Sequence, residues 1–224
     1  MVITHHGGQC FKVTFGDLTL VFDPINKGAT IPPVRFGADI AFVSRDHPDM
    51  NGIGEVTYGE KVPFAIVGPG EYERQGIVAQ GFLSRSAYPA SPKATQGEWP
   101  RYINTIYSVK IEDMTLVHLG ALIDSELPRE ARENIDEIDV LFVPIGGNGV
   151  LTPTAAHELA VSLEPKVIIP MHWSPPAGGN QSTVLQTFLK EAGNGSEKVD
   201  KLTLKKKDLI GLGGSILVIT PYHS

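Results

Sequence analysis

Residues 39–52 read DIAFVSRDHPDMNG. The first part, DIAFVS, is an apolar run bounded by turn residues, which is typical of a strand that is buried on both of its faces. The ionisable segment RDHPD follows directly, from Arg45 to Asp49. A loop that follows a buried strand is held rigidly, and functional sites are often built on such loops. We therefore expect this loop to contribute to a functional site.

The composition predicts an ordinary globular protein. The chain has 224 residues, of which 42% are hydrophobic and 20% charged, and we expect residues 1–224 to form a single domain with a substantial core. The formal net charge of -6, from 19 Lys and Arg against 25 Asp and Glu, argues against nucleic-acid binding. The short basic run 205–207 is expected to be a solvated turn or strand edge.

Two absences from the sequence narrow the class of protein further. Cys10 is the only cysteine, which excludes an intrachain disulfide and a metal cluster held by several thiolates. The sequence has no basic and apolar leader and no apolar run long enough to span a membrane. We therefore expect a cytoplasmic protein without a membrane partner.

The order of the apolar segments predicts sheets covered by helices, in the α/β (α+β) class. Strands are expected at residues 2–4, 10–15, 18–22, 39–44, 63–67, 78–83, 104–111, 114–119, 140–144, 166–170, 201–204 and 215–219, and helices at 128–137, 153–163 and 182–192. Thr152 and Pro153 are suited to the N-cap and the first position of the second helix. Residues 85–100 carry Pro and Gly without periodicity, so we expect a long surface loop there.

Several segments of this sequence resemble, in the same order along the chain, segments of the metallo-β-lactamase-fold hydrolases. The stretch 44–50 is similar to their Ser/Thr-His-x-His-x-Asp-His signature. Further segments resemble one branch of these hydrolases, which is similar to the L-ascorbate-6-phosphate lactonases. These segments are Gly7, Cys10-Phe11, Asp23-Pro24, 68–73 (GPGEYE), 104–107 (NTIY), 118–122 (HLGAL), 144–147 (PIGG) and 170–172 (PMH). The resemblance implies a four-layer αββα sandwich, with the site at the sheet edges where these loops meet.

The resemblance also implies which residues would hold metal. In that family, zinc is bound by the signature loop, a mid-chain histidine, the aspartate of a Gly-Asp pair and a final histidine. Of these ligands the sequence retains His47, Asp49 and His172. The departures are Arg45 and Met50 at two histidine positions and Ala121 at the bridging aspartate, and residues 79–117 contain no histidine.

These departures argue against a two-metal site. Two neighbouring divalent ions need a bridging carboxylate or hydroxide to offset their repulsion, and Ala121 supplies no carboxylate. Arg45 is always charged and has no lone pair with which to bind a cation, and Met50 is a soft, weak ligand. We therefore expect at most one ion, zinc or another divalent metal, held by His47, Asp49 and His172. Two histidines and one carboxylate are the ligand count of a catalytic zinc site with one open position.

Two functions follow from this residue set. In the first, a metal-bound hydroxide attacks an ester, lactone or phosphoester, with Asp49 or Asp46 orienting it. In the second, the protein is a metal-free pseudo-enzyme in which Arg45 takes over the electrostatic role of the metal and binds a small anion or a partner. A metal-free hydrolase with His47 or His172 as general base is a variant of the second. In either case the expected ligand is a small anionic molecule.

Two further residues near the expected site receive structural interpretations. His118 ends an apolar strand at a position that is not a ligand in the resembled family, so we expect a satisfied structural histidine. Asp23 precedes Pro24, and the sequence leaves open whether it forms a turn or supports the site.

Overall fold

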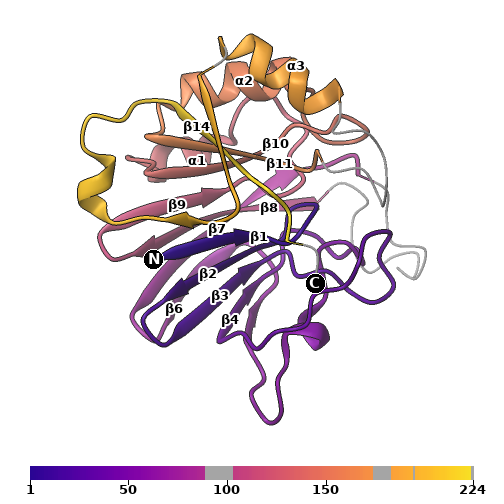
Figure 1. The fold of residues 1–224 in the computed structure, drawn as a ribbon. Helices are drawn as coiled ribbons and strands as arrows, with labels where there is room; N and C mark the ends of the chain where they lie inside the picture. The colour runs from indigo at the N-terminus through magenta and orange to yellow at the C-terminus, as the bar shows by residue number, and fades with distance from the viewer. Residues whose placement is uncertain (89–102, 174–182, 194, 223–224) are drawn as a thin grey trace.

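The computed structural model describes residues 1–88, 103–173, 183–193 and 195–222. Within these ranges the strands form one sheet of six and one of eight, packed face to face (Figure 1). The first sheet has the order β13 (Leu202–Thr203), β1 (Val2–His5), β2 (Phe11–Phe15), β3 (Leu18–Phe22), β4 (Ile40–Phe42), β5 (Phe64–Ile66). The second has the order β12 (Ser196–Val199), β14 (Ser215–Ile219), β11 (Val167–Met171), β10 (Val140–Pro144), β9 (Met114–His118), β8 (Ile103–Ile111), β7 (Ile77–Arg85), β6 (Gly70–Arg74).

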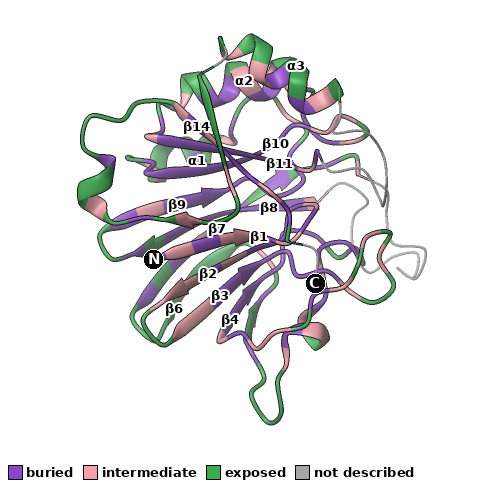
Figure 2. Cartoon of the chain, viewed as in Figure 1, coloured by how far each residue is buried: buried purple, intermediate pink, exposed green. Residues whose placement is uncertain are grey.

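The core between the sheets is built from apolar side chains that point inward from both of them, and Figure 2 shows the central strands as buried. Phe22 stacks on Phe42 with the ring centroids 4.9 Å apart, and Phe11 packs on Phe142 at 4.6 Å. The three residues of β4 are all buried, as the apolar run DIAFVS predicts. Burial of such side chains is the main stabilising contribution to a sandwich of this kind.

Helices cover the outer face of the eight-stranded sheet (Figure 1). They are α1 (Arg129–Asn134), α2 (Pro153–Ser162) and α3 (Thr183–Glu191). Leu159 of α2 and Phe188 of α3 belong to the apolar cluster that joins these helices to the sheet. The Thr152 side chain accepts a 3.3 Å hydrogen bond from the Ala155 backbone, so it caps α2 as the sequence predicts.

The other outer face is covered by a thinner layer. It consists of irregular chain between β3 and β4 and of the 3-10 helix η1 (Ile53–Val56), which pack on the six-stranded sheet through a third apolar cluster. A second 3-10 helix, η2 (Lys206–Leu209), follows β13 and contains part of the basic run. The predicted four-layer sandwich is therefore confirmed, with one outer layer that is mostly irregular chain.

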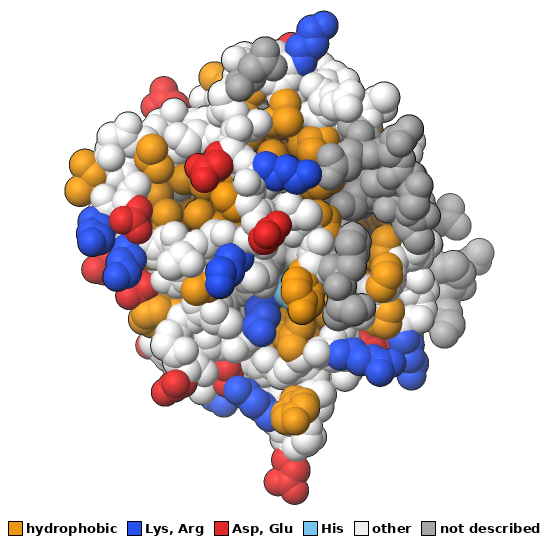
Figure 3. Space-filling view, in the orientation of Figure 1, with side chains coloured by type: hydrophobic (Ala, Val, Ile, Leu, Met, Phe, Trp, Pro, Cys, Tyr) orange, Lys and Arg blue, Asp and Glu red, His pale blue; other side chains and the backbone are white. Residues whose placement is uncertain are grey.

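Two features of the fold bear on sequence expectations about partners. No helix within the described residues is long and apolar enough to cross a membrane. On the face shown in Figure 3, side chains of both charge signs are interspersed over the surface.

Most of the loop expected at 85–100, namely residues 89–100, lies outside the described residues.

Candidate functional site

The loop that follows β4 is anchored at its first residues. The Val43 backbone N–H donates to the Ile66 carbonyl at 2.9 Å. The Asp23 carboxylate accepts two hydrogen bonds of 2.7 Å from Ser44, one from its backbone N–H and one from its hydroxyl. Burial raises the pKa of Asp23 to about 7. Asp23 therefore supports the loop, which resolves the alternatives that the sequence leaves open.

His118 is a structural histidine, as expected. Its Nδ1 accepts from the Gly120 backbone N–H at 3.2 Å, and its Nε2 lies 3.1 Å from the Gln9 carbonyl oxygen. The ring stacks on Phe22 at 4.9 Å, and burial lowers its pKa to about 3. His118 is therefore neutral, with its proton on Nε2, and it ties the end of β9 to the turn before β2.

His47 and Asp49 lie side by side within the loop. The Asp49 backbone N–H donates to His47 Nδ1 at 3.2 Å, and the Asp49 Oδ2 lies 3.6 Å from the same nitrogen. The other carboxylate oxygen of Asp49 accepts a 3.0 Å hydrogen bond from the Thr30 backbone. Burial lowers the pKa of His47. The imidazole and the carboxylate thus share one small, mostly buried space.

His172 reaches the same space from the end of β11. Its φ of 58° places it in the left-handed region, and its backbone N–H donates to the Gly8 carbonyl at 2.8 Å. Gly146 makes room for it, because a Cβ at that position would lie 2.6 Å from His172 Cδ2 and closer still to the His172 carbonyl oxygen. Burial lowers the pKa of His172 to about 4, so the ring is neutral at pH 7.

Tyr88 joins these three residues, although the sequence analysis did not select it. Its ring lies edge-on to His47 and to His172, with 4.9 Å between centroids in both cases. Its hydroxyl donates a 2.6 Å hydrogen bond to Asp49 Oδ2. Tyr88 follows the end of β7, close to the stretch in which the resembled family has its mid-chain histidine. This position in the sequence is the one feature that could have indicated Tyr88 before the structure was known.

Of the two other predicted site residues, Arg45 lies next to the cluster and Asp46 lies outside it. Arg45 is only 7% exposed. Its Nη1 donates to the Ile103 carbonyl at 2.6 Å and its Nη2 to the Tyr88 carbonyl at 2.9 Å. Asp46 is exposed, and its carboxylate accepts a 2.8 Å hydrogen bond from the Asn51 side chain. The structure therefore brings His47, Asp49, His172 and Arg45 together, and leaves Asp46 at the surface.

Apolar side chains line the remaining side of the cluster. Met50, Ala121 and Val150 are buried against one another, and Tyr88 packs on them. Met50 and Ala121 are two of the positions at which the resembled family has ligands. The Ala121 backbone N–H donates to the Asn104 side chain at 2.7 Å. Apart from the weak Met50 thioether, this side of the site therefore offers no side-chain ligand to a cation.

The donor set has the right chemistry for one divalent ion, but the present arrangement does not fit one. Among the described residues, no group of three or more His, Cys, Asp and Glu side chains is placed to hold a metal ion. The Tyr88 ring packs edge-on against both imidazoles, and its hydroxyl donates to the Asp49 carboxylate. The space that a cation would need beside these three side chains is therefore taken by a phenol.

The Gln9 side chain contacts the ring of His172. It is 1% exposed, its amide nitrogen lies 3.0 Å from His172 Nδ1, and its Oε1 has no hydrogen-bond partner among the described residues. If the amide turned over, Oε1 would accept a hydrogen bond from Nδ1–H and leave the lone pair of Nε2 free. That is the orientation in which a ligating histidine is normally held. The supporting shell is thus compatible with a metal-binding His172.

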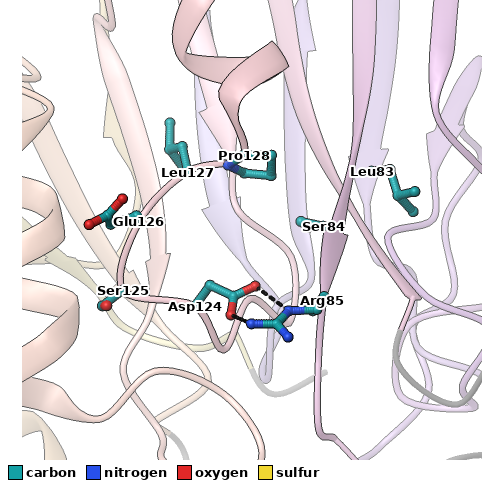
Figure 4. Close-up of a pocket in the computed structure, with 8 residues that line it drawn as sticks. All are labelled: Leu83, Ser84, Arg85, Asp124, Ser125, Glu126, Leu127 and Pro128. Carbon is teal, nitrogen blue, oxygen red and sulfur yellow. Dashed lines mark hydrogen bonds and ion pairs between the residues drawn. The ribbon is translucent and has the colours of Figure 1, made fainter.

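A separate groove of about 550 Å³ lies between the end of β7 and the segment that leads into α1 (Figure 4). The exposed Arg85 guanidinium crosses it and pairs with the Asp124 carboxylate through Nε at 3.0 Å and through Nη2. None of the predicted site residues lines this groove. An exposed ion pair of this kind contributes little to stability.

Two facing sheets with helices outside, and a residue cluster at the ends of β4, β7 and β11, define a protein of the metallo-β-lactamase fold class. The sequence agrees with that class. The family model described as a β-lactamase superfamily domain matches residues 2–172, and the chain belongs to this superfamily.

Relatives that match most of this chain share one description. The chain is 29% identical over 197 residues to a UPF0173 metal-dependent hydrolase of Carboxydothermus hydrogenoformans, a match that covers 78% of this chain and 85% of that one. It is 23% identical over 199 residues to the UPF0173 metal-dependent hydrolase YtkL of Bacillus subtilis, with coverage of 78% and 86%.

Solved structures show the same architecture over nearly the whole chain. One, described as a Zn-dependent hydrolase of the metallo-β-lactamase superfamily from Thermotoga maritima, is 26% identical, has a TM-score of 0.71, and is matched over 97% of both chains. A second, the metallo hydrolase Igni18 of Ignicoccus hospitalis, is 17% identical with a TM-score of 0.62 and coverage of 99% and 96%. The second likeness concerns the fold alone.

Proposed function

We propose that this chain is a metal-dependent hydrolase that uses at most one divalent ion, held by His47, Asp49 and His172. The observation that carries the proposal is that all three side chains contact one residue, Tyr88. Two imidazoles and one carboxylate match the ligand count of a catalytic zinc. The names of the relatives, which are metal-dependent hydrolases, support the same reading.

The substrate class follows from the resemblance to the branch similar to L-ascorbate-6-phosphate lactonases. We propose an ester, lactone or phosphoester that carries negative charge, because Arg45 contributes a buried cation beside the cluster. The identity of the ion as zinc, the cytoplasmic location and the absence of nucleic-acid and membrane partners stay predictions. Asp46 stays a weaker catalytic candidate, because its carboxylate is exposed and bonded to Asn51.

A second candidate function is the metal-free member of the superfamily, which binds a small anion or a partner beside Arg45. The filling of the cluster by Tyr88 and by the apolar side chains of Met50, Ala121 and Val150 favours it. An anion would have to approach Arg45 while Nη1 and Nη2 donate to backbone carbonyls. This candidate would be tested by searching for anions that protect the fold in wild type and lose that effect in Arg45→Met.

The first experiment is a measurement of metal content by mass spectrometry, on protein purified without a histidine tag and incubated with excess zinc. The His47→Ala and His172→Ala variants test the ligands, and His157→Ala on α2 is the matched control. About one equivalent in wild type and in the control, lost in both ligand variants, supports the proposal and justifies screening esters, lactones and phosphoesters for hydrolysis. Absence of bound ion in wild type would leave the metal-free candidate in its place.

A further inference from the structure

Tyr88 is in contact with each of the three candidate ligands. Its ring is nearly perpendicular to those of His47 and His172, with interplanar angles of 83° and 85°. Its hydroxyl donates to Asp49 at 2.6 Å, a short distance that is typical of a bond to a charged acceptor. Burial, followed by the bond to Asp49, raises the pKa of Tyr88, so the phenol keeps its proton.

The backbone around Tyr88 is fixed on several sides. Its N–H donates to the Ser86 hydroxyl at 3.0 Å, and its carbonyl accepts from Arg45 at 2.9 Å. The preceding N–H, that of Ala87, donates to the Gly149 carbonyl at 2.9 Å. Gly149 allows this approach, because a Cβ there would lie 2.6 Å from the Tyr88 nitrogen. These hydrogen bonds fix the backbone of Tyr88 and so place its side chain at the candidate site.

Three of the departures from the ligand pattern of the resembled family contact Tyr88. Arg45 replaces a histidine and binds the Tyr88 carbonyl. Met50 and Ala121 replace a histidine and an aspartate, and both belong to the apolar cluster on which the Tyr88 ring packs. The three replacements are far apart in their chemistry, and in the structure all three residues contact Tyr88.

We propose that Tyr88 is a built-in occupant of the candidate metal site, and that a divalent ion and Tyr88 in this position exclude one another. The inference rests on the proposed function, because it needs a cation site beneath the phenol. An ion at His47, Asp49 and His172 requires the oxygen that Tyr88 now engages and the space that its ring fills. Metal binding is therefore coupled to displacement of Tyr88, and the energy of that displacement lowers the apparent affinity.

Zinc titration against a competing fluorescent chelator tests this coupling. Wild type is compared with Tyr88→Ala, which removes the ring and the hydroxyl, and with Tyr88→Phe, which removes only the hydroxyl. Tyr58→Ala is the matched control, since Tyr58 is 76% exposed. We expect at least tenfold tighter zinc binding in Tyr88→Ala, a smaller gain in Tyr88→Phe and no change in the control. Zinc should also perturb the tyrosine absorbance of wild type and leave that of Tyr88→Phe much less changed.

The outcomes separate the two proposals. Equal affinities in wild type and both Tyr88 variants would overturn the exclusion and leave the metal site in place. Zinc bound by none of the three proteins would overturn the exclusion and the one-metal hydrolase together. Zinc bound by the Tyr88 variants alone would support the exclusion and would replace the one-metal hydrolase by the metal-free candidate for the wild-type chain. Thermal denaturation checks the fold of each variant, and Tyr88→Phe keeps the comparison decisive should Tyr88→Ala fail to fold.

Discussion

The Tyr88 hydroxyl donates a 2.6 Å hydrogen bond to the Asp49 carboxylate, and the Tyr88 ring packs edge-on against both His47 and His172. A phenol thus occupies the point at which a cation would otherwise be expected. The same contact makes Tyr88 a contributor to stability, because Asp49 is buried and its charge needs donors. Stability and metal binding therefore oppose one another at this residue.

Tyr88→Phe is expected to destabilise the protein in the absence of metal. The substitution removes a donor to a buried carboxylate, and such a bond contributes about 1–2 kcal/mol. Urea denaturation of wild type and variant in the presence of a chelator measures the difference, with the exposed Tyr58→Phe as control. A variant as stable as wild type would mean that the hydroxyl bond to Asp49 adds nothing to the folded state.

Arg45→Lys is expected to cost about 2 kcal/mol, although it preserves the charge. The guanidinium reaches the carbonyls of Ile103 and Tyr88 together, and a single ammonium cannot reproduce that fork. Chemical denaturation measures the loss, and Arg35→Lys, at an exposed arginine, is the control. An Arg45→Lys variant as stable as Arg35→Lys would show that a single ammonium can replace the fork.

Gly146→Ala is expected to destabilise the protein by about 2 kcal/mol, because the new methyl group would overlap the backbone and ring of His172. The displaced His172 should also lose zinc affinity in the titration described above. Gly54→Ala is the matched control, since nothing lies within 4 Å of a Cβ there. Normal stability in Gly146→Ala would show that β11 and the following residue can shift without cost.

His118 is expected to make the protein less stable in acid. Its pKa is about 3 in the folded state against a usual 6.5, so the folded state binds fewer protons than the unfolded state between these values. The stability that neutral His118 provides is present above pH 6.5 and is lost as the pH falls toward 3. The slope reaches about 1.4 kcal/mol per pH unit for one such group.

His118→Asn should remove this slope, while His157→Asn on α2 should retain it. The slope of the unfolding free energy against pH must be compared between wild type and variants, because Asp23 contributes to this slope with the opposite sign to His118. Its pKa is raised to about 7 from 3.8, so its contribution falls as the pH rises through that window. Urea denaturation between about pH 4.5 and pH 7.5 gives the two slopes. Parallel slopes for wild type and His118→Asn would show that His118 binds the same number of protons in the folded and unfolded states.

Strong local patterns in the sequence determined most of the fold. The strands β3, β10 and β14 have the predicted bounds, and Thr152 with Pro153 begins α2 as expected, because apolar runs and caps act through neighbouring residues. The prediction failed for β6 and β12, which carry mostly exposed, polar side chains at the edges of the second sheet. An edge strand without a buried face leaves no hydrophobic period to detect.

The sequence also supplied, through its resemblance to a family, the residues His47, Asp49 and His172, and the tertiary structure decided how they are used. Arg45 interacts with the carbonyls of Tyr88 and Ile103, which lie 43 and 58 residues further along the chain. Every residue has a carbonyl, so no pattern of side-chain types can indicate which of them a guanidinium will bind. Tyr88 was missed for a related reason, because a tyrosine shows its role only when the chain has folded it against its partners.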